Sequence, residues 1–126
     1  MRKTEMILRG ILTLYVLSEI MESPMTGYEL EKTISRKFNV KLPKGSIYVI
    51  LRNAERKNLL RYKEDKNRKG QILKKYVITE EGRKFFLEHE EPLSIAKEVM
   101  SDLLKKMEIK RTEASAPPNG LRQEKD

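Results

Sequence analysis

The chain contains no cysteine, no tryptophan and only one histidine among its 126 residues. The lack of cysteine excludes disulfide bonds, thiolate metal sites and cysteine nucleophiles together, and it fits a cytoplasmic protein. The histidine, His89, has no second ligand at a metal-binding spacing, so we expect neither a metal nor a cofactor.

Long apolar runs are missing as well. The most apolar stretch, residues 6–21, carries Arg9 and Glu19 and is shorter than the roughly 20 residues that span a bilayer. No small-residue cleavage site follows it, which argues against a signal peptide. We therefore expect a protein without a membrane-spanning segment.

Catalytic motifs are also absent. The sequence has no phosphate-binding glycine loop and no nucleophile elbow. Its neighbouring acidic pairs, Glu80-Glu81 and Glu90-Glu91, would point apart on a helix, so they do not form an acid/base dyad. These absences argue against an enzyme.

Positive charge is concentrated in one region. Residues 32–76 contain 15 basic and 3 acidic side chains, a net charge of +12, whereas the rest of the chain contains 12 basic and 16 acidic ones, a net charge of −4. A surface selected only for solubility would mix the two signs. The segregation favours a polyanionic partner, and nucleic acid is the most common one.

Apolar spacing and capping residues predict two helices at the start of the chain. Residues 5–21 are apolar nearly all round, so this helix must be covered on more than one side, and in so short a chain a second subunit is a natural cover. Thr26 and Glu29 have the spacing of a capping box, which predicts a second helix that ends near Phe38.

A third helix is predicted over residues 44–57, because its apolar residues follow a core-facing spacing. Tyr48, Arg52 and Arg56 fall on another face, four residues apart. Asn58, which tolerates the left-handed conformation, follows as a helix end. A helix of this kind can enter the major groove of DNA.

Two short strands, residues 60–64 and 72–78, predict a β-hairpin around a polar turn. Its tip, residues 66–70, carries three cations within five positions.

Thr79 is placed to cap a fourth helix. Pro92 starts or bends a further helix, which carries an apolar stripe, and from about Glu108 the sequence becomes polar and predicts a disordered tail.

Five segments between about Leu8 and Leu104 form a recognisable set. They are Leu8-Arg9-Gly10-Ile11-Leu12, Thr26-Gly27-Tyr28-Glu29-Leu30, Gly45-Ser46-Ile47-Tyr48-Val49-Ile50-Leu51, Asn58-Leu59-Leu60 and Lys75-Tyr76-Val77-Ile78-Thr79-Glu80-Glu81-Gly82. In their order and spacing they resemble the PadR-like winged-helix transcriptional regulators. Asn58 stands where that family usually has glycine, and Ala54 replaces a larger apolar residue.

The resemblance implies an α+β, mostly helical fold: a winged helix-turn-helix with a C-terminal dimerisation helix. The third helix would be the recognition helix and the hairpin the wing. The expected division is a DNA-binding domain over residues 1–90, a dimerisation helix over 91–108 and a disordered tail over 109–126. The short C-terminal helix is typical of the compact subgroup of the family.

Charge, spacing and resemblance together give two sets of candidate residues. Thr26 could serve as a helix cap, as a DNA-backbone contact, or as both. The DNA-binding candidates are Thr26, Tyr28, Lys44, Ser46, Tyr48, Arg52, Arg56, Lys63, Lys66, Arg68 and Lys69. The dimer-interface candidates are Leu8, Ile11, Leu12, Tyr15, Leu93, Ala96, Met100, Leu103, Leu104 and Met107.

The predicted function is a transcriptional regulator, in particular a repressor, that binds an inverted-repeat operator in double-stranded DNA as a homodimer. The resemblance also implies a small hydrophobic molecule as effector, although the chain lacks the tryptophan with which some relatives sandwich aromatic ligands. Two alternatives stay open. One is an architectural protein that coats DNA with low sequence specificity, and the other is a winged helix that docks an acidic protein partner.

Overall fold

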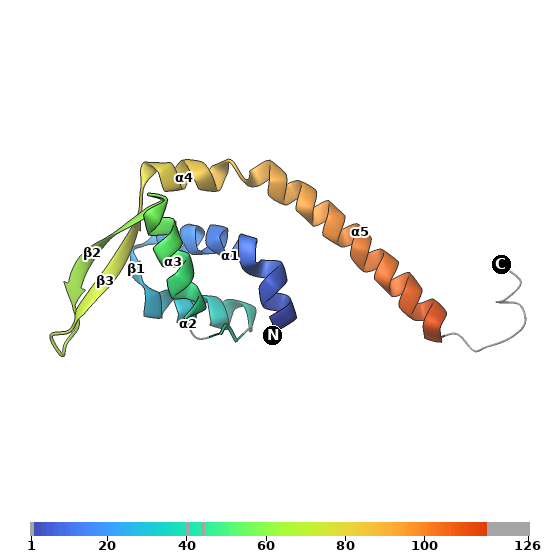
Figure 1. Ribbon diagram of the computed structural model, residues 1–126, viewed down its shortest axis with the longest axis horizontal. Helices are drawn as coiled ribbons and strands as arrows, with labels where there is room; N and C mark the ends of the chain where they lie inside the picture. The colour runs from blue at the N-terminus through green and yellow to red at the C-terminus, as the bar shows by residue number, and fades with distance from the viewer. Residues whose placement is uncertain (1, 40, 44, 116–126) are drawn as a thin grey trace, which may run out of the picture. The chain divides into compact units, whose positions relative to one another are not determined.

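The computed structural model describes residues 2–39, 41–43 and 45–115 (Figure 1). The chain divides into two compact units, residues 1–88 and 89–126. Within the described residues, the first unit contains the helices α1 to α4 and a three-stranded sheet, and the second contains α5.

Helix α1 (Arg2–Glu22) forms one side of the core of the first unit. It contacts α3, α4 and β3, so it is covered from several directions, as a helix that is apolar nearly all round requires. Its N-terminal part is less covered, because Met6 and Ile7 are exposed. The buried apolar residues of α1 are Leu12, Leu14, Val16, Leu17 and Ile20.

Helix α2 (Gly27–Phe38) begins at the predicted capping box. The Thr26 hydroxyl accepts a hydrogen bond from the Glu29 backbone N–H at 3.1 Å, and the Glu29 carboxylate accepts one from the Thr26 N–H at 2.9 Å. Leu30 and Ile34 turn inward and are buried. The helix ends at Asn39, whose left-handed conformation (φ 51°) allows its N–H to bond to the Ser35 carbonyl.

Helix α3 (Ser46–Arg56) is shorter than predicted at its start. Gly45 precedes it with φ 86°, a conformation that glycine adopts without strain. Ile47, Leu51 and Ala54 lie on one face and are buried in the core. After the helix, Asn58 adopts the left-handed conformation (φ 62°), which confirms the helix end predicted there.

The sheet is antiparallel and has the strand order β1-β3-β2. Strands β2 (Leu60–Lys66) and β3 (Ile72–Ile78) form the predicted hairpin, called here the wing, and Figure 1 shows it projecting from the helices of the first unit. Strand β1 (Met25–Thr26) adds two residues to β3, and the sequence analysis missed it.

Helix α4 (Glu80–Leu87) is joined to the end of α3 through Thr79. The Thr79 hydroxyl accepts a hydrogen bond from the Gly82 N–H at 2.9 Å, which confirms the predicted cap, and it donates one to the Asn58 carbonyl at 2.7 Å. Gly82 lies so close to the Leu59 carbonyl that a Cβ would overlap it. The start of α4 therefore packs directly on the chain between α3 and the wing.

Helix α5 (Glu90–Ser115) makes up the described part of the second unit, with Pro92 in its first turn. It continues past residue 108, where the sequence predicted the tail to begin, and residues 109–115 are helical. The rest of the predicted tail, residues 116–126, lies outside the described residues. No helix in the described ranges is long and apolar enough to cross a membrane.

Candidate nucleic-acid interface

One face of α3 is polar and exposed, opposite the face that enters the core. Val49, Arg52, Asn53 and Arg56, called here the outer face of α3, follow the spacing i, i+3, i+4 and i+7 and are all exposed. The Asn53 side-chain oxygen accepts a hydrogen bond from Arg56 Nη1 at 3.4 Å. Arg52 and Arg56 thus lie together, as the sequence predicted, whereas Val49 and Asn53 were not among its candidates.

Tyr48 lies beside the outer face, on the flank of α3 that turns toward the wing. Its side chain is 43% exposed and lines a groove of about 610 Å³ between the start of α2, α3 and β3. Polar side chains from all of these elements meet in this groove; six of its lining residues are Thr26, Tyr28, Tyr48, Arg52, Asn67 and Lys74. The groove therefore brings together four of the predicted DNA-binding residues.

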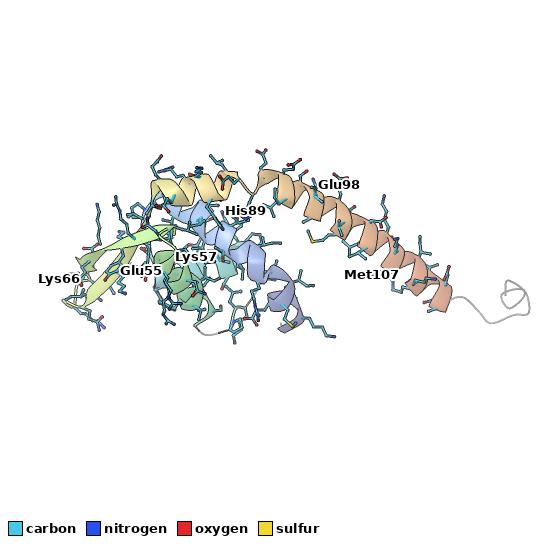
Figure 2. All side chains as sticks on the ribbon, turned by 45° about the horizontal axis from the view of Figure 1, so that its top comes forward. Glu55, Lys57, Lys66, His89, Glu98 and Met107 are labelled. Atoms are coloured by element: carbon cyan, nitrogen blue, oxygen red, sulfur yellow. The ribbon has the colours of Figure 1, made fainter. Side chains whose placement is uncertain are left out.

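Two of the groove's side chains carry charges that the sequence analysis did not select. Lys74 lies over the Tyr62 ring, with its Nζ 4.3 Å from the ring centroid, and it adds a cation to the wall formed by the wing. Glu55 lies half-buried on the opposite wall and is the only acidic residue of α3. Figure 2 shows Glu55 on α3 and Lys66 on the wing.

The tip of the wing presents its cations on a fixed turn. The Asn67 side-chain oxygen accepts hydrogen bonds from the backbone N–H groups of Lys69 and Gln71, both at 2.9 Å, and Gly70 takes up a positive φ of 81°. Lys66, Arg68 and Lys69 are exposed around this turn. Their charges are thus displayed together at the end of the hairpin, as predicted.

Lys63 lies on the other face of the wing. In the register of the hairpin, Lys63 is opposite Lys75. Side chains alternate between the two faces of a strand, so Lys63 and Lys75 point to the face opposite that of Tyr62 and Lys74. Lys63 and Lys75 line a separate hollow with Glu29. The structure therefore does not bring Lys63 together with the groove residues.

Three DNA-binding candidates, Tyr28 of the groove together with Ser46 and Lys44, remain to be placed. Tyr28 is 60% exposed, and Lys32 lies over its ring with Nζ 5.1 Å from the centroid. The Ser46 hydroxyl is buried and has no hydrogen-bond partner within the described residues. Lys44 lies outside the described residues.

The dimer-interface candidates lie in two places. On α1, Leu8, Ile11 and Tyr15 are half-buried, whereas Leu12 is only 6% exposed, because its side chain packs in the core of its own chain. The Tyr15 ring packs edge-on against Phe38, with the centroids 4.8 Å apart. On α5, Ala96 is half-buried and the other candidates are exposed, namely Leu93, Met100, Leu103, Leu104 and Met107.

Two groups of the first unit, Lys37 and Tyr76, have pKa values shifted by their surroundings. Lys37 of α2 donates a hydrogen bond to buried Glu19 of α1 at 2.8 Å, and this bond, aided by Tyr15, raises the pKa of Lys37. Burial, aided by the charge of Glu55, raises the pKa of the Tyr76 phenol. Tyr76 is also one of the residues that line the groove.

Comparison with known proteins assigns this fold to a family. The model of the transcriptional regulator PadR-like family matches residues 16–88. Among solved structures, a transcriptional regulator from Thermoplasma acidophilum is 40% identical, with a TM-score of 0.76 over 80% of this chain and 97% of that one. A PadR family regulator from Eggerthella lenta is 26% identical, with a TM-score of 0.70 over 82% and 89%.

A PadR-like regulator from Bacillus cereus shares the fold at 24% identity, with a TM-score of 0.67 over 79% of this chain and 96% of that one. The search of curated proteins gave no match. The family match and the Thermoplasma relative confirm the predicted resemblance, the winged-helix fold and a non-enzymatic role. The chain belongs to the PadR-like family of transcriptional regulators, which bind DNA through a winged helix.

Proposed function

We propose that this regulator is a repressor that binds an inverted-repeat operator as a homodimer. In this proposal α3 of each subunit enters the major groove with its outer face toward the bases, and the wing contacts the DNA backbone or a minor groove. The observation that carries it is the division of α3 into a buried apolar face and an exposed face with Arg52, Asn53 and Arg56.

The groove beside α3 supports phosphate contacts next to the base-reading face. Lys74 supplies positive charge from the wing, and the Tyr48 hydroxyl is a hydrogen-bond donor on the α3 side of the groove. Phosphate contacts of this kind position a protein on the duplex without reading its sequence. We therefore assign positioning to Tyr48 and the wing tip, and sequence readout to the outer face.

The homodimer is supported by the apolar stripe on α5. Leu93, Met100, Leu103 and Met107 are between 38% and 57% exposed, more apolar surface than a solvated helix normally carries on one side. A twofold dimer that binds two half-sites in successive major grooves has its two copies of α3 about one helical turn of DNA apart, roughly 10 base pairs. The operator would then be an inverted repeat.

Selection of bound duplexes from a random library, followed by footprinting, tests the proposal. We expect an inverted repeat with protected half-sites separated by about 10 base pairs or a multiple. Transcription from a promoter that contains the selected sequence should fall when the protein is added. Uniform protection of unrelated sequences would instead indicate an architectural protein, and no duplex binding at low salt would indicate a protein-interaction module.

A further inference from the structure

Val49 is the one apolar side chain on the outer face of α3. It is 49% exposed and lies one turn before Arg52 and Asn53, opposite the face that carries buried Leu51. It is not part of the hydrophobic core of the first unit. Single apolar residues are common on protein surfaces, so the significance of Val49 lies in its position.

Helix formation does not explain a valine at this position. A β-branched side chain loses rotamer freedom in a helix, so valine is a poorer helix former than alanine, lysine or arginine. Because Val49 is exposed and lies outside the core, it also contributes little to the stability of the fold. A compact apolar side chain exposed at this position is available for contact with an apolar group of a partner.

The major groove offers one such group on the edges of the bases, the 5-methyl group of thymine. Val49 is the fourth residue of α3, and the N-terminal residues of a recognition helix are the ones that contact base edges. We infer that Val49 contacts a thymine methyl group and thereby selects an A·T pair at one position of each half-site. This inference rests on the proposed placement of α3 in the major groove.

Deoxyuridine substitution tests the inference on the operator selected above. Replacing each thymine in turn by deoxyuridine removes only the methyl group and leaves the hydrogen-bonding pattern of the base unchanged. The unsubstituted protein should lose about four-fold in affinity at one thymine of each half-site, the effect of one methyl group taken out of an apolar contact. Replacing both symmetric thymines should give about the square of that loss.

Val49→Ala should bind the unmodified operator more weakly and be insensitive to deoxyuridine at that same pair of positions. Val49→Thr, which keeps the branched shape and one methyl group, should retain part of the sensitivity. Asn53→Ala is the matched control on the same face, and it should keep the full methyl effect at this position. Thermal unfolding of each variant shows whether the fold is intact, as expected for an exposed residue.

A preferred operator on which no thymine methyl group matters would overturn the role of Val49 and leave sequence-specific binding intact. The same conclusion follows if Val49→Ala keeps the full sensitivity at the same thymines. If the library yields no preferred duplex, the proposed function fails, and the role of Val49 fails with it.

Discussion

The Tyr48 ring of α3 lies directly against the backbone of Gly27, the first residue of α2. A Cβ at position 27 would lie 2.9 Å from Tyr48 Cζ and closer still to Cε1, so a larger residue does not fit while the ring keeps its place. Gly27 is buried beneath the ring. The glycine therefore determines where the Tyr48 side chain sits in the groove between α3 and the wing.

Gly27→Ala is expected to displace the Tyr48 ring and weaken DNA binding about ten-fold, the loss of one hydrogen bond to a charged phosphate. Stability should change little, because alanine is the better helix former and the displaced atoms belong to the end of a side chain. The measurement is a double-mutant cycle on duplex DNA. In a Tyr48→Ala background, Gly27→Ala should cause no further loss, and an equal loss in both backgrounds would show that Gly27 acts independently of Tyr48.

Replacing Leu103 and Leu104 together by lysine should convert the proposed homodimer to monomers, because both are interface candidates on α5 and would place two charges on its apolar side. Sedimentation equilibrium at micromolar concentration measures the change. The matched control is the replacement of Ile95 and Ile109 together by lysine. Both are 56% exposed but lie away from the stripe, so this change should leave the proposed dimer intact. A monomeric unmodified protein would contradict the assembly itself.

The wing tip and the outer face of α3 should have different effects on specificity. Changing Lys66, Arg68 and Lys69 together to alanine should weaken operator and random duplex similarly. The logarithmic salt dependence should become shallower by about 0.9 for each phosphate that the tip no longer neutralises. If neither affinity nor salt slope changes, the tip does not touch DNA.

Arg52→Ala should lose about 1–3 kcal/mol more on the operator than on random duplex, the discrimination expected from a bidentate contact to a base. Titrations on both duplexes at several salt concentrations measure this difference. An equal loss on both would assign Arg52 to positioning, through its place in the groove beside Lys74, and move sequence readout to its neighbours on the outer face.

The free energy of unfolding should decrease as the pH rises above about 10. Lys37 has a pKa raised above 10.5 by its bond to Glu19, and Tyr76 has a pKa raised above 10.0 by burial. A raised pKa in the folded state stabilises the protein fully below the ordinary value, and this contribution is lost as the pH rises through the raised one. Denaturant titrations across this range measure the decrease. Tyr76→Phe should make it shallower, and Tyr28→Phe, at an exposed tyrosine, is the matched control.

Sequence reasoning succeeded where one local signal determines the structure. The capping box of Thr26 and Glu29, the cap at Thr79 and the left-handed Asn58 each depend on neighbouring residues, and the structure confirms them. Strand β1 could not be found in this way. Its two residues become a strand only because β3 lies beside them, and that pairing joins segments about fifty residues apart.

Only part of the candidate site was predicted from the sequence, because the rest also depends on contacts between distant segments or on uncharged residues. Selecting basic residues found Arg52 and the cations of the wing tip. It also selected Lys63, because the face of a strand is settled only by its pairing register. Val49 and Asn53 carry no charge, so that criterion passed over them, although their spacing with Arg52 was readable on a helical wheel. Gly27 was found only through its contact with Tyr48.

Core residues and outer-face residues alternate along helix α3. Ile47, Leu51 and Ala54 hold the helix in the core, whereas the outer face makes no such contribution. Mutations on the outer face are therefore nearly neutral for folding, and their main effect falls on DNA binding. A duplicated copy of this regulator could acquire a new operator by exchanging a few outer residues, without first losing a stable scaffold.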